Sequence, residues 1–434
     1  MKNSKLLLSA LAGLGLYSVS AQELSVDAMI RPRFEYRNGF IDAIAEDQEA
    51  SAFVEQRSSL LLKYTDEKIT TFLDIQSTNF WGDRAQLSPA DDNLRVNQGW
   101  AEIKLGEGWS TKLGRMQLSY DDQRILGGLG WAQQQRTHDA ALARYKSENF
   151  KADLGFAFNQ NGAASDAASA TVGNSFTASG AGVGLFQYKA MQYLHLNGKI
   201  AEGFTGSFLF MNNTFETVVD GAATETTFSK QTTGVYGKYK KEALGIEGSF
   251  YYQFGEANEA TDLSAYQALL NVTYKTGSTL LGIGGEILSG DDADSVGENE
   301  AFFPLFGTNH KFNGFQDFFY VGRHANNVGL IDLNAKAVFK TGPKSKVLTK
   351  LHYFSGASET DYLGTSLDVV YTQGITPYAN IKLGFSNTLL DDDFADARVR
   401  NSGEEASSIQ SWGWIMLTVK PNLFKWKKEP QAAK

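Results

Sequence analysis

Arginine is concentrated on one side of the first long alternating stretch of the chain. In "IRPRFEYR", residues 30–37, apolar side chains alternate with Arg31, Arg33, Glu35 and Arg37. A guanidinium group stays charged and presents a planar fork of donors that binds a carboxylate through two parallel hydrogen bonds. Arginines gathered on one face of a strand would therefore bind anions, or would pair with carboxylates on neighbouring strands.

Alternation of this kind recurs along the chain and predicts the elements that carry these side chains. It is clear in "FKADLGFAFN" (150–159), "GLIDLNAKAVFK" (329–340) and "YANIKLGFS" (378–386). A period of two over segments this long indicates strands rather than helices. Strands that cross an outer membrane at a tilt need about nine to eleven residues, which these segments supply.

Turn residues divide the connections between these segments into two alternating classes. The short ones are 65–68, 106–108, 146–149, 198–203, 240–243, 275–278, 341–344 and 373–376. The longer ones are 38–52, 79–92, 119–138, 160–184, 212–227, 255–262, 290–328, 356–361 and 388–407. Short periplasmic turns alternating with long extracellular loops are typical of outer-membrane barrels. We therefore predict an all-β fold, a transmembrane antiparallel β-barrel of about 18 strands.

The ends of the chain differ from this repeating pattern. Residues 1–21 have a basic start, a short apolar run and small residues before Gln22, as a secretory signal peptide does. We expect the barrel to occupy residues 22–424 and a basic periplasmic tail to occupy residues 425–434. The signal peptide and the absence of cysteine from so long a chain favour the bacterial envelope.

The overall charge excludes one class of partner. The chain has 40 lysines and arginines against 49 aspartates and glutamates, a formal charge of −9. A nucleic-acid-binding protein is expected to carry a basic surface, so we expect no nucleic-acid partner.

Several stretches resemble a known family. They are "IRPRFEYRNGF", "QGWAEIKLGEGWSTKLGRMQLSYDDQRILGGLGWAQQQRTHDAALARY" and "AFFPLFGTNHKFNGFQDFFYVG". The chain resembles the alginate-export-type outer-membrane porins, in the form found in Bacteroidetes. The resemblance implies a monomeric 18-stranded barrel in outer-membrane lipid, with an arginine-rich, anion-selective constriction through which an acidic polysaccharide passes.

These observations predict a passive channel for anionic, carbohydrate-type (alginate-like) solutes. The alternative is a general or differently specific porin, because a shared fold does not fix the solute. The sequence leaves the solute and the direction of transport open.

The chemistry of a channel lies in the residues that line its lumen. The pore-lining candidates in the strands are Arg31, Arg33, Arg37, Arg57, Arg115, Arg144 and Lys104, with Glu35, Glu55 and Asp74 among them. Arg31, Arg33, Arg57 and Arg115 outnumber the acids near them, so we expect these four to meet the solute first. Rings of arginine and lysine favour anions in pores. The alternative is a structural ladder, in which these charges pair with one another across the wall.

Two long connections are expected to fold into the pore. Residues 119–138 are too polar for a lipid-facing strand, and Arg124 and Arg136 lie there beside a run of three glutamines. These side chains would bind the carboxylates and hydroxyls of a sugar acid, or would pack on the rim for structure alone. Residues 302–322, within the 290–328 loop, are rich in aromatic residues and predict a plug or lid.

Catalytic and metal sites have weaker signals. Ser119, His138 and Asp139 lie close together in the sequence but match no hydrolase signature, so we do not expect an enzyme. The acidic segment 289–300 fails the spacing of a calcium-binding EF-hand, and the histidines lack metal-ligand spacing. We expect no cofactor and no metal.

Overall fold

The computed structural model describes residues 22–83, 87, 94–159, 188–219, 222–292, 295–319, 328–358, 361–396, 405–407 and 409–428. The expected signal peptide, residues 1–21, lies outside them. The first half of the wall is β1 (Gln22–Asn38), β2 (Ser51–Thr65), β3 (Ile69–Phe80), β4 (Leu94–Gly106), β5 (Trp109–Met116), β6 (His138–Lys146), β7 (Phe150–Phe158), β8 (Ala190–Ala201) and β9 (Phe204–Val219). The second half is β10 (Ala222–Lys241), β11 (Leu244–Asn258), β12 (Thr261–Thr276), β13 (Thr279–Leu288), β15 (Leu330–Gly342), β16 (Ser345–Ser355), β17 (Tyr362–Thr376), β18 (Ala379–Leu390) and β19 (Ile409–Val419).

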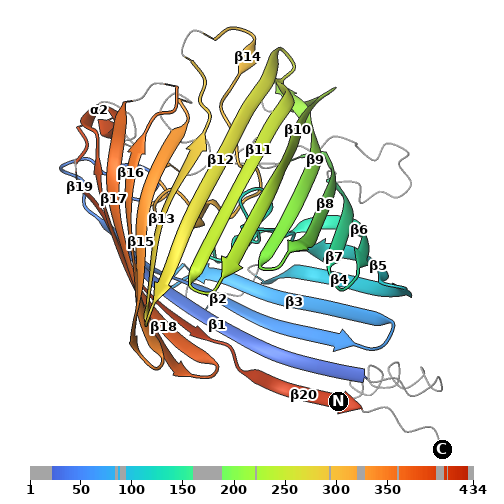
Figure 1. The fold of residues 1–434 in the computed structure, drawn as a ribbon. Helices are drawn as coiled ribbons and strands as arrows, with labels where there is room; N and C mark the ends of the chain where they lie inside the picture. The colour runs from blue at the N-terminus through green and yellow to red at the C-terminus, as the bar shows by residue number, and fades with distance from the viewer. Residues whose placement is uncertain are drawn as a thin grey trace, which may run out of the picture.

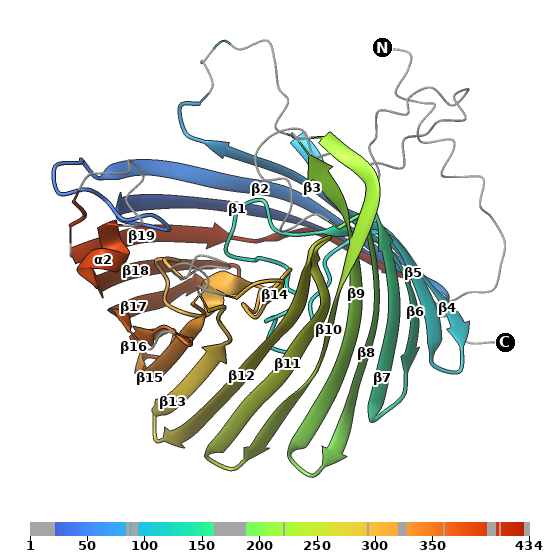
Figure 2. The ribbon, with the colours of Figure 1, turned by 90° about the horizontal axis from the view of Figure 1, so that it is seen from above.

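These strands form a closed antiparallel barrel of 18 strands, as predicted (Figures 1 and 2). Each strand pairs with the next in the sequence, and β13 pairs with β15. The barrel closes because β1 pairs with β2 on one side and with β19 on the other. At that seam Arg31 lies opposite Arg57, and Arg33 lies opposite Met416. Closure leaves no open edge in the wall, which a lipid environment requires.

Burial alternates along the strands and separates an inner from an outer face. On β1, Arg33 and Glu35 are 3% and 0% exposed, whereas Ile30 and Tyr36 are 49% and 46% exposed. The exposed large apolar side chains continue around the barrel on β4, β7, β13 and β18. The apolar face therefore meets lipid, and the polar face lines the interior.

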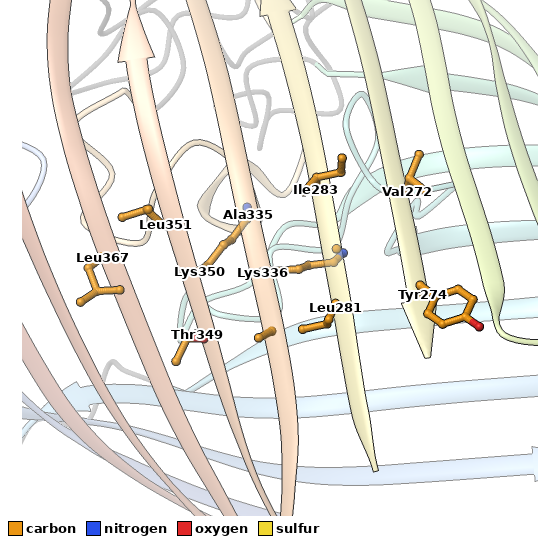
Figure 3. A pocket seen from close by; sticks show the side chains of 12 residues that line it. Val272, Tyr274, Leu281, Ile283, Ala335, Lys336, Thr349, Lys350, Leu351 and Leu367 are labelled. Atoms are coloured by element: carbon orange, nitrogen blue, oxygen red, sulfur yellow. The ribbon is translucent and has the colours of Figure 1, made fainter. Parts of the chain in front are cut away.

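The outer wall contains an apolar groove of about 580 Å³ (Figure 3). Its floor includes Ala335 and Ala337, and Ile283 and Leu351 border it from β13 and β16. Lys336, also drawn in Figure 3, takes the alternate position on β15, so its side chain belongs to the inner face.

The connections follow the predicted alternation of short and long, with two exceptions. Eight short turns, including residues 342–345 and 376–379, lie at one end of the barrel. The expected loops at 212–227 and 255–262 are wrong, because β9 and β10 run to Val219 and from Ala222, and β11 and β12 run to Asn258 and from Thr261. These strands therefore extend beyond the wall as hairpins (Figure 1).

The remaining elements are short. β14 (Glu298–Asn299) pairs in parallel with β12, η1 spans Asn309–Lys311 and α2 spans Asp392–Asp396. β20 (Asn422–Lys428) continues past β19 and pairs with the start of β1. The predicted start of the C-terminal tail, residue 425, falls inside β20. Among the described residues, no helix is both long and apolar enough to cross a membrane.

Candidate functional site

The connection between β5 and β6, residues 117–137, lies inside the ring of strands (Figure 2). We call it the inner loop. Arg31 and Arg57, directly opposite each other on β1 and β2, hold it by its backbone carbonyls. Arg31 donates to the carbonyl of Gly130 at 2.7 Å, and Arg57 donates to those of Ala132 and Gln133 at 2.5 and 2.6 Å. The hydrogen-bond donors of these two arginines are therefore directed at the inner loop.

Arg33 joins the same loop to the acids of the wall. Its guanidinium donates to the carbonyl of Trp131 at 2.9 Å and to Glu35 at 2.8 Å, and it pairs with Glu55. Glu35 also accepts from Arg37 at 2.8 Å. The arginines of "IRPRFEYR" thus meet both carboxylates and loop carbonyls, so the structural-ladder alternative describes much of their bonding.

Trp131 lies at the centre of an aromatic cluster inside the barrel. The Arg33 guanidinium is 3.8 Å from the centre of its ring, and His310 stacks on it with centroids 4.6 Å apart. Trp412 and Trp414 of β19 meet it edge-on at 5.5 and 4.8 Å. Stacking on an arginine and packing among aromatic rings fix the loop firmly against the wall.

Asp74 on β3 belongs to the neighbouring polar cluster. It is 2% exposed and accepts from Asn97 of β4 at 2.8 Å. Asn97 also donates to the side chain of Gln135, and Arg95 donates to the carbonyl of Gln134. The sequence argument did not single out Arg95, because its strand begins beside a long loop.

Arg124 and Arg136 join the inner loop to the connection between β13 and β15. Arg124 is 1% exposed, pairs with Glu286 of β13 at 2.6 Å and donates to Asn313 at 2.8 Å. Arg136 donates to the carbonyl of Gly307 at 2.9 Å. The structure therefore favours the packing role for this pair over the expected contact with a sugar acid.

The described part of the aromatic-rich segment lies against the inner wall of the barrel, where a plug was predicted. The described part, residues 295–319, reaches the inner wall of β15–β18. Asn313 donates to Asp332 at 3.1 Å, and the backbone of Phe315 donates to Asp368. His352 lies between these carboxylates, with Nδ1 2.7 Å from Asp332. The carboxylates of Asp332 and Asp368 are therefore already bonded to the plug and to His352.

Arg115 differs from the expectation. It shares its face of β5 with Leu113, which is 48% exposed, and it pairs with Asp139 on β6 at 2.6 Å. Both partners are about half exposed, so Arg115 lies on the outer face near the end of β5 and does not line the lumen. Glu102 and Lys104 of β4 lie opposite Lys112 and Ser110, so the inner face of β5 carries those two residues, and Arg115 shares the outer face with Leu113.

The same arrangement separates the residues considered for catalysis. His138 lies on the inner face with Nδ1 2.7 Å from the hydroxyl of Tyr188, while Asp139 lies on the outer face. Adjacent residues of a strand point to opposite faces, so Asp139 cannot orient His138.

Arg144 lies on the inner face of β6, near the end of the barrel that carries the short turns. It pairs with Glu102 and with Asp153, each at 3.1 Å. Lys104 donates to the carbonyl of Asp66 at 3.2 Å. These residues line a cavity of about 970 Å³.

Lysines that the sequence argument passed over form a second basic surface. They lie on the inner face of β15, β16 and β18: Lys336, Lys340, Lys346, Lys350 and Lys382. We call this set the lysine wall. In strand register, Lys336 lies opposite Lys350 and Lys340 lies opposite Lys346. Among the described residues, these five ammonium groups make no hydrogen bond and no ion pair. The alternation in "GLIDLNAKAVFK" was a signal for Lys336 and Lys340, and that in "YANIKLGFS" was a signal for Lys382.

Asp122 is a buried carboxylic acid of the inner loop. Burial raises the pKa of its carboxyl from 3.8 to about 6, although Lys311 opposes the shift. Oδ1 accepts from the backbone of Arg124 at 3.0 Å, and Oδ2 is buried without a hydrogen-bond partner. A protonated Asp122 therefore suits the docked loop best.

No group of three or more potential metal ligands occurs in the part of the chain that the structure describes.

Comparison with known families decides the identity of the barrel. The profile of the family described as "Alginate export" matches residues 22–380, most of the chain. The chain belongs to the alginate-export family. Alginate-export proteins are outer-membrane barrels, so this chain is a bacterial outer-membrane channel protein. A search of curated proteins finds no match.

Solved porins resemble this alginate-export protein in fold. OccAB1 of Acinetobacter baumannii has a TM-score of 0.62 at 12% identity, with 92% of this chain and 97% of that chain covered. A BenF-like porin of Pseudomonas fluorescens has a TM-score of 0.59 at 11% identity, covering 92% and 99%. OccK11 of Pseudomonas aeruginosa has a TM-score of 0.57 at 13% identity, covering 94% and 99%.

Proposed function

We propose that this protein is a passive channel for anionic, carbohydrate-type solutes, among which alginate-like uronates fit best. The observation that carries the proposal is the lysine wall. Two of its cross-strand pairs, Lys336 with Lys350 and Lys340 with Lys346, bring like charges together inside the barrel. Lysine lining favours anions in a pore.

The proposal gives the two basic surfaces different tasks. Arg31, Arg33 and Arg57 hold the inner loop through its carbonyls, and they set the width of the pore through that loop. The lysine wall supplies the charge that a passing carboxylate meets, mainly from Lys340, Lys346 and Lys382, because Lys350 lies opposite Asp368 of β17 in register. The family to which the chain belongs supports an acidic polysaccharide as the solute.

A general porin is the competing function. Block of the channel by three sugars of different charge separates a general porin from an anion channel. Single-channel current through the purified protein is recorded with triguluronate, with a neutral trisaccharide and with a trisaccharide amine. The proposed function predicts block by triguluronate at a concentration at least tenfold lower than by the neutral sugar. Equal block by all three sugars would show a general porin.

The lysine wall is tested by removing charge from one pair. Lys340→Gln with Lys346→Gln should weaken block by triguluronate about tenfold and lower the anion preference. The matched control is Lys241→Gln with Lys344→Gln, which removes the same charge at two short turns, where both side chains are exposed and make no ion pair with a described residue. An unchanged block in the Lys340/Lys346 variant would contradict the role given to this wall.

A further inference from the structure

The cavity near Arg144 lies at the end of the barrel where the short turns and both described chain ends are found. Its lining comes from the turn after β2 and from β4, β5, β6 and β7. We call it the periplasmic basin. Lys104, Arg144 and Asp153 follow the inward alternation of their strands, so the basin opens toward the lumen.

The two acids that the strands contribute to the basin, Glu102 and Asp153, already have partners, and Glu67 of the turn after β2 also lines it. Arg144 bridges Glu102 and Asp153 at 3.1 Å each. Glu102 also accepts from Ser110 at 2.8 Å, and Asp153 accepts from the hydroxyl of Tyr120 at 2.8 Å. Arg144 therefore neutralises one of the two carboxylates, and the hydroxyl groups of Ser110 and Tyr120 complete their hydrogen bonds within the wall.

Two lysines of the basin are not neutralised in this way. Lys146 on β6 and Lys151 on β7 lie directly opposite each other in register and share the inner face. Their ammonium groups make no hydrogen bond or ion pair with any residue that the structure describes. Like charges directly opposite on a sheet are destabilising unless something of opposite charge lies between them.

The Arg31–Arg57 pair shows how this protein satisfies such a pair elsewhere. Both guanidinium groups donate to the carbonyl of Gly130, at 2.7 and 3.3 Å, and both donate to that of Ala132. Acceptors of the inner loop thus bridge two cations that face each other across strands. The Lys146–Lys151 pair has the same arrangement, and the described chain supplies no acceptor for it.

The opposite end of the barrel has the opposite charge. Described acidic side chains there include Glu46, Asp47, Glu49, Asp391, Asp392 and Asp393. An anion in solution is repelled at that mouth and attracted at the basin, because charged entrances concentrate counter-ions.

We propose that the periplasmic basin is a binding site for the carboxylates of an acidic oligosaccharide, bridged by Lys146 and Lys151, at which solute is loaded from the periplasm. This site rests on the proposed anion channel and adds a direction to it. Solute bound there faces the lumen, where the lysine wall is the next free positive surface.

The test is the sidedness of block in a planar bilayer. Triguluronate is added to one compartment at a time, and streptavidin binding to a C-terminal biotin identifies which compartment faces the periplasmic end. Wild type should be blocked from the periplasmic side at a concentration at least tenfold lower than from the extracellular side. Lys146→Gln with Lys151→Gln should remove that difference, and Lys146→Glu with Lys151→Glu should reverse it.

The control and the alternative outcomes keep this inference separate from the proposed function. Lys241→Gln with Lys344→Gln changes the net charge equally at the same end, outside the basin, and should keep the sidedness. Heat-modified mobility in gel electrophoresis shows that each variant barrel is folded. Equal block from both sides, or full sidedness in the Lys146/Lys151 variant, would overturn the basin while leaving an anion channel intact. A wild-type channel that prefers cations would overturn the channel proposal itself.

Discussion

Single arginines in this protein donate hydrogen bonds to backbone carbonyls as well as to carboxylates. Arg57 is 2% exposed and donates to three carbonyls of the inner loop, those of Gly130, Ala132 and Gln133. A neutral carbonyl is a weaker partner than a carboxylate, because charge on both groups strengthens a hydrogen bond. A carboxylate of an anionic solute would therefore bind an accessible guanidinium more strongly than a loop carbonyl does. The loop carbonyls keep these donors because they already lie next to them.

Removing one guanidinium should release the inner loop. In Arg57→Ala, each lost hydrogen bond to the charged group costs about 1.5–3 kcal/mol, so the loop should leave its docked position part of the time. We expect larger and noisier single-channel conductance and faster proteolysis within residues 117–137. Lys63→Ala on the same face of β2 is the control and should behave as wild type. A conductance equal to wild type in Arg57→Ala would show that the loop does not limit the pore.

The Asp122 carboxyl should make loop docking depend on pH. Its pKa is about 6 when docked and 3.8 ordinarily, and a raised folded pKa stabilises the docked state below the ordinary value. That stabilisation, about 3 kcal/mol at about 1.4 kcal/mol per pKa unit, is lost as pH rises through 6. Most of this loss falls between about pH 4 and pH 6, so conductance should increase across that range and change little above about pH 7.

Asp122→Asn tests the assignment of this pH response. The amide cannot ionise, so the variant should keep its low-pH conductance across the range, although Lys311 and Arg124 still surround the position. A pH response as large in Asp122→Asn as in wild type would assign the response to another group.

Among the elements, the strands were predictable from the sequence, whereas the positions of the loops inside the barrel were not. Alternation in stretches such as 378–386 is imposed locally by lipid on one side and water on the other, so it can be read from sequence. The inner loop and the plug depend on contacts between distant residues. Gly127 donates to Phe306 at 2.9 Å, and Arg124 reaches Glu286. No local pattern in the sequence indicates such pairs. Arg115 was misplaced although Leu113, two residues earlier on the same face, indicates the lipid-facing side of β5.

Close backbone approach between the two segments gives a direct test of their docking. A Cβ at Gly127 would lie 2.8 Å from the backbone nitrogen of Thr308, whereas a Cβ at Gly130 would meet nothing within 4 Å. Gly127→Ala should therefore weaken docking by about 1–3 kcal/mol, as overpacking does. Amide hydrogen exchange at residues 124–127 should accelerate in Gly127→Ala and stay at the wild-type rate in Gly130→Ala. Equal exchange in the two variants would contradict the docked pair.

At the scale of the whole molecule, the charges are sorted by place although their sum is negative. The net charge is −9, yet lysines without an ion pair to a described residue line the lumen, and acids are concentrated at the extracellular end. The sequence could reveal the acidic loops and the arginines of β1. It could not reveal that the arginines would be occupied by the inner loop, because those contacts join residues far apart in the sequence. The pairing of Lys336 with Lys350 follows from the register of the β15–β16 hairpin.

The reversal potential under a potassium chloride gradient tests the central claim most directly. The wild-type protein is placed in a planar bilayer with a tenfold gradient, and the sign of the potential at zero current identifies the preferred ion. The account predicts chloride preference, reduced in Lys340→Gln with Lys346→Gln. A potential that shows potassium preference in the wild type would contradict an anion channel.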